Sequence, residues 1–314
     1  MFDKFKYIYG PVASRRLGRS LGLDLIPHKT CSYDCIYCQL GRTTNKTTAR
    51  REYVSCNDVL LEIKEKLVRG LDCDYISLAG CGEPTLHSSI GELIEGIKKL
   101  TTIPVVVLTN GSLLYLPEVQ DALMKADLII PSLDAGDEDL FHYVNRPHKD
   151  ISFDVMVNGI IDFTRKFSGR VWLEVLLISG VTGMAPEAKK IAVWAEKIGA
   201  DKVQLNTVDR PAAEDFACAV ERKQMEKLAI LFPGVVEIIG AAEKRKTSDK
   251  SLCDATDADI LSLLTRRPST ISGICAGLTL HPHEAAKKLQ HLVEDGLVTT
   301  RRADHDLFYK ISGK

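Results

Sequence analysis

The sequence predicts an α/β protein with a mainly parallel sheet, followed by a small helical unit. Between about residues 20 and 232, short apolar strands alternate with segments of helical periodicity, six times in succession. Such alternation is typical of a parallel sheet with helices packed outside it. After a polar stretch at 240–253, the pattern changes to short helices and a hairpin. We therefore expect three parts: residues 1–239, a linker at 240–253, and residues 254–314.

The elements of the first part follow from apolar runs and from apolar residues recurring every three or four positions. The run Pro104-Val-Val-Val-Leu-Thr109 is almost wholly apolar, which indicates a strand buried on both faces. The predicted strands are 21–26, 75–79, 104–109, 128–133, 171–178 and 202–206, and the predicted helices are 57–69, 90–100, 116–125, 153–167, 186–198 and 221–231.

Composition restricts the class of protein. The 314 residues are 45% hydrophobic and 26% charged, which is ordinary for a globular protein. No apolar run of about 18 residues and no basic-then-apolar leader occurs, so we expect neither a membrane span nor a secretory signal. Nine cysteines without a leader argue against a secreted disulfide framework and favour a cytoplasmic protein. With a net charge of −1, nucleic-acid binding would need local basic patches.

Three cysteines follow the first predicted strand closely. Cys31, Cys35 and Cys38 have the spacing C-x-x-x-C-x-x-C, with Tyr37 just before the last. Thiolates this close in sequence can converge on one metal centre, and sulfur ligands select Zn or an Fe–S cluster. Structural zinc normally takes four protein ligands, and no fourth is obvious nearby. The spacing favours a 4Fe–4S cluster with one iron open to a ligand that is not protein.

This loop resembles the signature of the radical S-adenosylmethionine (radical SAM) superfamily. The resemblance implies that the three thiolates hold the cluster and that the open iron binds the amino and carboxylate groups of SAM. An electron from the reduced cluster, delivered by a donor such as ferredoxin or flavodoxin, would then split SAM into a 5′-deoxyadenosyl radical. The resemblance also implies that the sheet forms an open (β/α)6 partial TIM barrel.

Short polar segments follow the next three predicted strands, at the end of the sheet where catalytic groups gather. Gly80-Cys81-Gly82-Glu83 resembles the Gly-Gly-Glu element of the superfamily, in which small residues admit the methionyl amine and Glu83 would balance its charge. Thr109-Asn110-Gly111 resembles a segment that contacts the ribose or carboxylate of SAM. Ser132 and Asp134 resemble the Ser-x-Asp element on the SAM side. Each segment alone could instead be an ordinary turn.

Three further segments resemble the 4-demethylwyosine synthase-like group. They are Ser14 to Gly18, Phe141 to Pro147, and Gln204 to Pro211. The resemblance implies that Asn206, in the last segment, lies beside the cofactor. It implies the same for Tyr37 in the cysteine loop. That group rebuilds a methylated guanosine beside the anticodon of tRNA, which implies an RNA nucleoside as substrate. Its named members also bind an auxiliary cluster through upstream cysteines, whereas no cysteine precedes Cys31 here.

Many basic residues lie close to the cysteine loop in the sequence. They could form a solvated charged surface, or they could line one mouth that receives a phosphate-bearing substrate. The residues are Arg15, Arg16, Arg19, Lys29, Arg42, Lys46, Arg50 and Arg51.

The last part resembles a winged helix–turn–helix domain. Helices are predicted at 257–265, 271–276 and 282–295, with Gly277 as the C-cap of the second, and a hairpin from 297 onward. The third helix and the wing would expose basic side chains. This face could bind nucleic acid, or it could dock a protein or present a substrate. The residues concerned are His283, Lys287, Lys288, His291, Arg301 and Arg302.

The sequence as a whole favours a radical SAM enzyme that abstracts hydrogen from a substrate, with an RNA nucleoside preferred. One alternative keeps the radical SAM chemistry but acts on a peptide or a small metabolite. Another is an Fe–S-sensing, DNA-binding regulator, although a sensor would not need the three SAM-like segments.

Overall fold

The computed structural model describes residues 5–239, 255–278, 280–303 and 306–313. The predicted linker at 240–253 lies outside these ranges.

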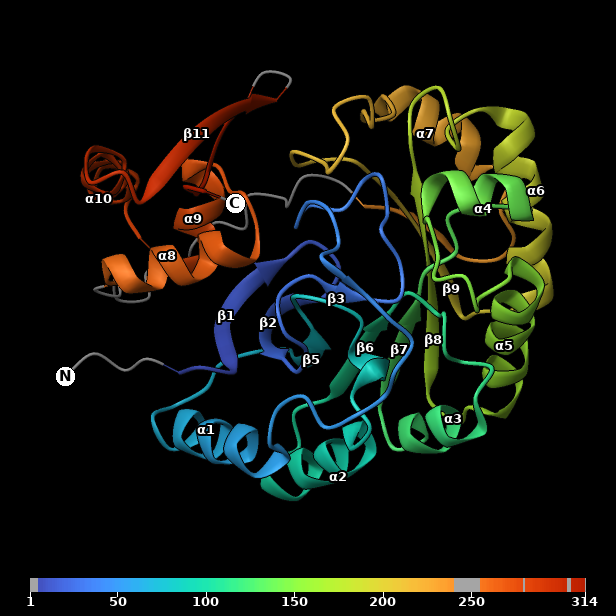
Figure 1. The fold of residues 1–314 in the computed structure, drawn as a ribbon, viewed down its shortest axis with the longest axis horizontal. Coiled ribbons are helices and arrows are strands. Elements are labelled where there is room, and N and C mark those ends of the chain that lie inside the picture. The colour runs from blue at the N-terminus through green and yellow to red at the C-terminus, as the bar shows by residue number, and fades with distance from the viewer. Residues whose placement is uncertain (1–4, 240–254, 279, 304–305, 314) are drawn as a thin grey trace.

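The main element is an eight-stranded sheet in which the strands follow their order in the chain (Figure 1). Its first strand runs antiparallel to the second, and every later neighbour is parallel. The predicted mainly parallel sheet is confirmed. The strands are β1 (Ile8–Ser14), β2 (Gly18–Asp24), β5 (Tyr75–Ala79), β6 (Val105–Thr109), β7 (Leu128–Pro131), β8 (Arg170–Leu177), β9 (Lys202–Thr207) and β10 (Val236–Ile238).

Helices cover one face of this sheet (Figure 1). Several begin at a residue whose side chain accepts a hydrogen bond from the first turn, as Ser55 does from Asp58 and Ser152 from Val155. The α6 helix has Pro186 in its first turn and ends at Gly199, which is left-handed with φ 66°. The helices are α1 (Cys56–Val68), α2 (Ile90–Leu100), α3 (Pro117–Leu123), α4 (Glu138–Val144), α5 (Phe153–Lys166), α6 (Ala185–Ile198) and α7 (Arg222–Ala229).

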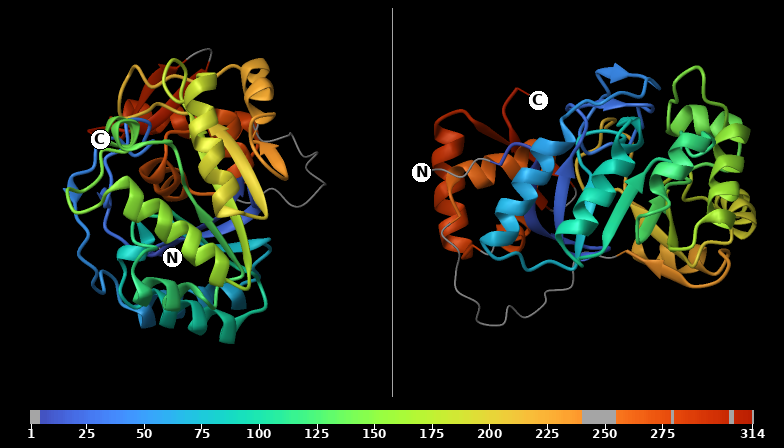
Figure 2. Two further views of the ribbon diagram at one scale, coloured as in Figure 1. Left: turned by 90° about the vertical axis from the view of Figure 1, so that its right-hand side faces the viewer. Right: turned by 90° about the horizontal axis from the view of Figure 1, so that it is seen from below.

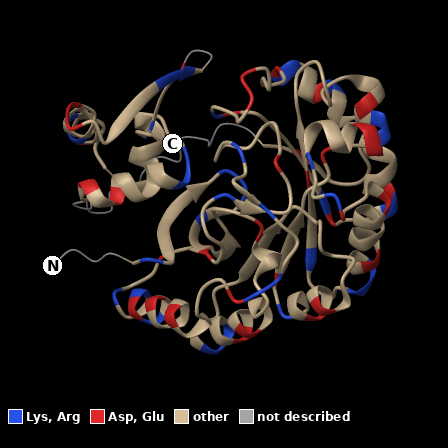
Figure 3. Cartoon of the chain, in the orientation of Figure 1, with Lys and Arg blue, Asp and Glu red and all other residues tan. Residues whose placement is uncertain are grey.

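The two faces of the sheet have different neighbours. Val105, Val107 and Ile129 belong to the large core formed with the helices. Their sequence neighbours Val106, Leu128 and Ile130 face the other way and form a small cluster with Leu17. The turn between β1 and β2 therefore lies over the inner face of the sheet. Outside, the helices carry Lys, Arg, Asp and Glu mixed together, with no single sign dominating (Figure 3).

Some elements were not predicted from the sequence. β1 contains Gly10-Pro11, which obscured it, and proline is tolerated there because β1 is an edge strand. The short helix α4 and the strand β10 were also missed, as were the two-residue strands β3 (Thr30–Cys31) and β4 (Asn45–Lys46), which pair with each other.

The C-terminal residues build three helices and a hairpin around a separate apolar cluster that includes Ile260, Ile274 and Leu289. Gly277 is not the predicted C-cap, because α9 continues through it. A Cβ there would lie 3.0 Å from Leu263 Cδ1, so the glycine allows α9 to approach α8 closely. The elements are α8 (Asp257–Arg266), α9 (Ile271–Leu278), α10 (Pro282–Glu294), and the antiparallel pair β11 (Val298–Ala303) and β12 (Asp306–Ile311).

This C-terminal unit packs against the first strand of the sheet (Figure 2). Val12 of β1 contacts its apolar cluster. Arg266 Nε donates to Asp24 Oδ2 at 2.5 Å, and the same guanidinium lies 4.4 Å from the ring centroid of Tyr9. Both charged side chains are largely buried, at 12% and 13% exposure. The unit is therefore fixed to the sheet by ionic as well as apolar contacts.

Candidate functional site

The cysteine loop follows β2 and is held by its backbone. Ile36 N donates to Val144 O at 2.9 Å, which joins the loop to the end of α4. Cys38 N donates to Cys35 O at 3.2 Å and closes a turn between these two cysteines. Asp34 Oδ1 accepts from Thr43 N at 2.7 Å. These bonds fix the loop without using any thiol.

The three thiols are only partly exposed, and each has a shifted pKa. Burial raises the pKa of Cys31 to about 12, and the neighbouring Glu83 and Cys38 add to the shift. Burial also raises the pKa of Cys35 well above its usual range, with Cys31 and Cys38 as further causes. The three groups thus lie within electrostatic reach of one another. Thiols so buried stay neutral unless a cation lies beside them.

Two side-chain amides point at these sulfurs. Asn110 Nδ2 lies 3.5 Å from Cys31 Sγ, and Asn145 Nδ2 lies 3.5 Å from Cys35 Sγ. N–H donors to ligating sulfur stabilise the thiolate and tune the potential of an Fe–S cluster. The donor set of three thiols and two amides fits a 4Fe–4S cluster that leaves one iron without a protein ligand.

Within the described ranges, no group of three or more His, Cys, Asp or Glu side chains converges on a single metal ion.

Glu83 joins the ends of β5 and β6. It is 2% exposed, and its Oε1 accepts from Thr85 N at 3.0 Å, from Thr85 Oγ1 at 2.6 Å and from Thr109 Oγ1 at 2.6 Å. Its Oε2 accepts from Asn110 N at 2.7 Å. Burial raises the pKa of Glu83, and these hydrogen bonds oppose the rise. Because a carboxylate offers about four acceptor positions, Oε2 keeps room for one further donor.

The glycines before Glu83 are required by close backbone contacts. A Cβ at Gly82 would lie 1.9 Å from Thr30 O, and Gly80 has a φ of 107°. Cys81 between them is buried, and its carbonyl accepts from Lys29 N at 2.8 Å. The segment therefore lies directly against the start of the cysteine loop.

The segment after β6 is hydrogen-bonded to the same loop. Asn110 Nδ2 also donates to Ser32 Oγ at 2.8 Å, and Ser32 Oγ lies 2.7 Å from Ser112 Oγ. Asn110 Oδ1 accepts from Ser112 N at 3.0 Å. Asn110 thus bridges a cysteine, the loop next to it and the end of β6.

Asp134 performs a similar linking role after β7. Its Oδ2 accepts from Tyr37 Oη and, at 3.0 Å, from Asn145 Nδ2, while its Oδ1 accepts from Leu176 N at 2.9 Å. Burial raises the pKa of Asp134 to about 6, against the effect of these donors. The carboxylate therefore positions Tyr37 and Asn145, which flank Cys35 and Cys38.

The remaining predicted residues lie around Glu174 of β8. Asn206 Nδ2 donates to Glu174 Oε1 at 2.9 Å, and Ser132 forms a parallel bridge with the Glu174 backbone. Glu83, Asn110 and Asp134 are thus linked to the cysteine loop or to each other, whereas Ser132 and Asn206 meet at Glu174. Sequence reasoning missed Ser32, Asn145 and Glu174. Asn145 lies inside the segment 141–147 that had been noted, whereas nothing marked Glu174 within its strand.

Most of the predicted basic rim is occupied by partners within the protein. Arg42 pairs with Asp34 at 2.9 Å and with Glu214 at 2.8 Å. Lys46 Nζ donates to two backbone carbonyls at 3.1 and 3.2 Å, and Arg50 Nε donates to Thr85 O at 3.0 Å. These side chains fasten loops and do not form an open cationic surface. On the C-terminal unit, Arg301 likewise pairs with Asp215.

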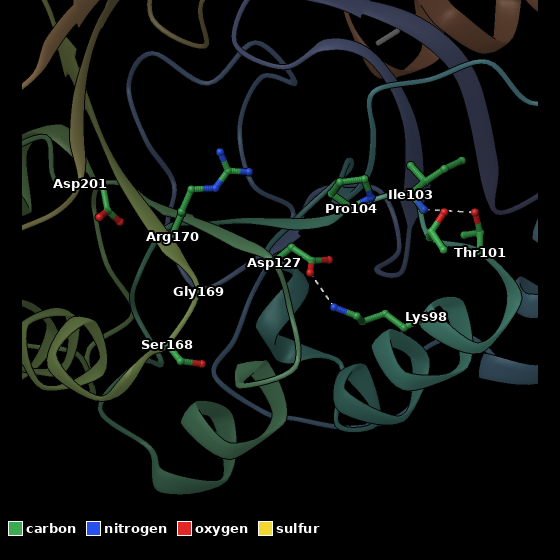
Figure 4. Close-up of a pocket in the computed structure, with 10 residues that line it drawn as sticks. Lys98, Thr101, Ile103, Pro104, Asp127, Ser168, Gly169, Arg170 and Asp201 are labelled. Carbon is green, nitrogen blue, oxygen red and sulfur yellow. Dashed lines mark hydrogen bonds and ion pairs between the residues drawn. The ribbon is translucent and has the colours of Figure 1, made fainter.

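A surface pocket lies at the opposite end of the sheet, before β6 to β9 (Figure 4). Its carboxylates already bind backbone: Asp127 Oδ2 accepts from Val105 N at 2.8 Å, and Asp201 Oδ2 accepts from Val171 N at 2.7 Å. Lys98 also pairs with Asp127 at 2.6 Å. Since residues at this end of such sheets serve stability, the pocket is not the catalytic candidate.

Comparison with known proteins decides the family. Residues 25–188, which include the cysteine loop and the segments after β5, β6 and β7, match the radical SAM superfamily. The chain belongs to this superfamily. The prediction of a radical SAM enzyme is confirmed at the level of the family, which implies SAM and a 4Fe–4S cluster as cofactors.

Relatives extend the match over the whole chain. A UPF0026 protein of Helicobacter pylori is 36% identical over 98% of both chains, so the chain also belongs to the UPF0026 proteins. A Brachyspira hyodysenteriae protein named GTPase Obg is 41% identical over 98% of this chain, which spans only 46% of that protein's length. The GTPase name is that protein's own, and the present sequence contains no G-x-x-x-x-G-K-[S/T] motif.

Solved structures support the fold alone. Streptococcus suis SuiB bound to a precursor peptide aligns with a TM-score of 0.55 at 14% identity, covering 72% of this chain and 51% of SuiB. SuiB bound to S-adenosylmethionine aligns with a TM-score of 0.53, covering 69% and 49%. Across the described residues, no helix combines the length and apolar character needed to cross a membrane.

Proposed function

We propose that this protein is a radical SAM enzyme whose 4Fe–4S cluster is held by Cys31, Cys35 and Cys38. The observation that carries the proposal is the arrangement of these buried thiols beside two amide donors, Asn110 and Asn145. When bound, the reduced cluster supplies the electron that splits SAM into a radical able to abstract hydrogen from a substrate. An iron–sulfur or flavin protein such as ferredoxin or flavodoxin would deliver the electron.

The chain's own residues would orient SAM next to the cluster. The backbone at Gly80 and Gly82 passes too close to neighbouring groups to admit side chains, which leaves backbone polar groups available. Glu83 Oε2 keeps one acceptor position that suits the methionyl ammonium. Asn110 would fix the cluster and SAM relative to each other. Cys81, Thr109, Ser132, Asp134, Asn206 and Tyr37 complete the proposed cofactor surroundings.

The finer architecture belongs to the same proposal. The curved run of strands from β2 to β9, with helices on one face, is consistent with an open (β/α)6 partial barrel over residues 1–239. Three helices followed by a hairpin are consistent with a winged helix–turn–helix unit over residues 254–314. Exposed His283, Lys287 and His291 on α10 give that unit a weakly basic outer face.

We propose an RNA nucleoside, such as one in tRNA, as the substrate. The support is the resemblance of three segments to the 4-demethylwyosine synthase-like group. Further support comes from Asn145, in the second segment, whose Nδ2 lies 3.5 Å from Cys35 Sγ, whereas Asn206, in the third, donates to Glu174 of β8.

The test is anaerobic reconstitution followed by measurement of iron, sulfide and 5′-deoxyadenosine. The intact chain should bind about four irons, as one 4Fe–4S cluster requires, and release 5′-deoxyadenosine when reduced with SAM present. Replacing Cys31, Cys35 and Cys38 together by Ala should abolish both. A matched triple variant of Cys56, Cys73 and Cys275 should retain both, since these thiols lie outside the loop. A full cluster in the first variant would exclude the assignment.

A further inference from the structure

Four arginines from distant parts of the chain meet on the inner face of the sheet. Arg15 and Arg16 belong to the turn between β1 and β2, whose Leu17 packs on that face. Arg210 follows β9, and Arg267 directly follows α8 of the C-terminal unit. No single sequence segment contains more than two of them, so only the fold assembles this arginine cluster.

Ion pairs bind the cluster together. Arg15 lies 2.9 Å from Asp209 Oδ1, and Arg210 lies 3.6 Å from Asp209 Oδ2, so one carboxylate bridges both. Arg16 pairs with Glu174 in the middle of β8. The side chains of Arg15, Arg16 and Arg210 keep 17%, 23% and 19% exposure, which leaves a path for a ligand.

Arg267 is different. Among the described residues its guanidinium has no hydrogen-bond or ion-pair partner, although it is not exposed. Asp209 attracts its charge and Arg15 repels it, so both lie within electrostatic reach of Arg267. A guanidinium offers five N–H donors, and no Arg267 nitrogen is among the side-chain atoms that are both fully buried and unpaired, so solvent or a ligand can reach them. The side chain is therefore positioned for an acceptor that the protein does not supply.

The charges do not balance. Four guanidinium groups face two carboxylates, Asp209 and Glu174, which leaves two positive charges in excess. The repulsion is visible at Arg210: burial lowers its pKa to about 10, Asp209 opposes this, and Arg267, Arg15 and Arg16 lower it further. A guanidinium is not deprotonated in proteins at neutral pH. A ligand with two negative charges would neutralise the excess.

We propose that Arg15, Arg16, Arg210 and Arg267 bind the dianionic phosphate of a phosphomonoester, and that this phosphate belongs to the substrate. The second clause rests on the proposed radical SAM activity, with a phosphorylated small metabolite such as a nucleotide as substrate in place of an internal RNA nucleoside, whereas the binding site itself does not. Guanidinium groups bind phosphate oxygens in pairs of parallel hydrogen bonds. A phosphomonoester carries close to two negative charges at pH 7, while an internal phosphodiester of RNA carries one. The C-terminal unit completes the site through Arg267.

The position suits a substrate of the cluster. Arg210 donates to Gln39 Oε1 at 3.0 Å, and Gln39 directly follows Cys38. Arg16 shares Glu174 with Asn206, one of the proposed cofactor neighbours. A phosphate held here would anchor a substrate beside the cysteine loop, with the rest of the molecule on the inner face of the sheet.

The test is calorimetric titration of the reconstituted full-length protein with SAM present and no reductant. The probes are inorganic phosphate, a nucleoside 5′-monophosphate, the corresponding nucleoside, and a dinucleotide with only an internal phosphodiester. We expect saturable binding of the first two and at least tenfold weaker binding of the last two. Loss of one paired guanidinium contact in Arg267→Gln should weaken phosphate binding roughly ten- to hundredfold.

Controls separate this site from general charge and from misfolding. Arg302→Gln removes one exposed charge from the same unit and should change phosphate affinity less than twofold, by about the margin expected of a distant surface residue. Arg267→Lys keeps the charge but lacks the planar fork, and should recover only part of the affinity. Without phosphate, Arg267→Gln should melt no lower than the natural protein, because it loses no hydrogen bond or ion pair to the described residues and relieves repulsion.

Three outcomes would overturn the proposal: no saturable phosphate binding, equal weakening in Arg302→Gln, or equal affinity for the phosphodiester. If Arg267→Gln does not fold, Arg210→Gln tests the same site. Formation of 5′-deoxyadenosine by the same preparation, once reduced, reports separately on the proposed function. A protein that cleaves SAM but ignores phosphate would therefore contradict only the arginine site.

Discussion

At the scale of single residues, the buried acids of the site mainly organise other groups. Glu83 accepts hydrogen bonds from Thr85 and from the end of β6, and Asp134 accepts them from the cysteine loop and from β8, so each carboxylate fastens different segments to one another. Sequence reasoning assigned both to SAM contacts because of the motifs in which they occur. It could not foresee that most of their acceptor positions are filled by the protein itself.

We therefore expect Glu83→Gln to have two effects. The amide would present an N–H group to donors such as Asn110 N and Thr109 Oγ1, which should lower the free energy of unfolding by about 1–3 kcal/mol. It would also weaken SAM binding roughly ten- to hundredfold, as expected for a lost charge-assisted contact. Iron content should persist, because Glu83 makes no hydrogen bond to a cysteine sulfur within the described part of the chain. Urea unfolding, equilibrium dialysis of SAM and iron analysis measure the three quantities.

The exposed position Glu196 on α6 provides a control, since Glu196→Gln should leave all three quantities unchanged. If Glu83→Gln binds SAM as tightly as the natural protein, the residue only supports the loops.

At the scale of elements, predictability depended on how continuous the apolar pattern was. The runs that became β5, β6 and β7, and the periodic segments that became α2 and α5, were placed to within a few residues. β1 was missed because Gly10-Pro11 interrupts it, although it forms the sheet edge that receives the C-terminal unit. Glu174 was missed because a strand's alternation says which face a residue occupies, not what that face contacts.

The one-turn helix η1 (Pro84–Leu86) carries a pH-dependent contact at its end. His87 is fully buried, its Nε2 lies 2.8 Å from Val54 O, and its Nδ1 has no partner among the described residues. Burial lowers the pKa of His87, with the Val54 carbonyl opposing the shift. The unfolded chain therefore binds the proton more readily than the folded one. The stabilisation is present above about pH 6.5 and should fall as the pH drops below it.

We expect His87→Gln, whose amide can still donate to Val54 O, to lose less stability than the natural protein between pH 7.5 and 5.5. Urea unfolding at several pH values measures this difference. His283→Gln, at an exposed position, should follow the natural protein throughout. Parallel pH curves for all three proteins would exclude His87 as the cause.

At the scale of the whole molecule, the sequence predicted a separate C-terminal unit after a polar linker at 240–253, without indicating how that unit is attached. The structure shows that unit fixed to the sheet through Val12, Tyr9 and the Asp24–Arg266 pair. Asp24 also contacts Cys81, inside the proposed SAM-binding segment. Docking of this kind depends on surfaces that no local sequence pattern reveals.

The Asp24–Arg266 pair should therefore make a measurable contribution to the free energy of unfolding. Burial raises the pKa of Asp24 and Arg266 opposes the rise, so removing the arginine leaves a buried carboxylate without its counter-charge. Arg266→Ala should lower the free energy of unfolding by about 3 kcal/mol at pH 7.5, the cost typical of breaking a buried pair. The exposed Arg302→Ala should change it by less than about 0.5 kcal/mol.

Because Asp24→Asn removes the charge left behind, the double variant Asp24→Asn with Arg266→Ala should be less destabilised than the two single effects added together. Equal losses in Arg266→Ala and Arg302→Ala, or strict additivity in the double variant, would mean that apolar packing on β1 alone attaches the C-terminal unit.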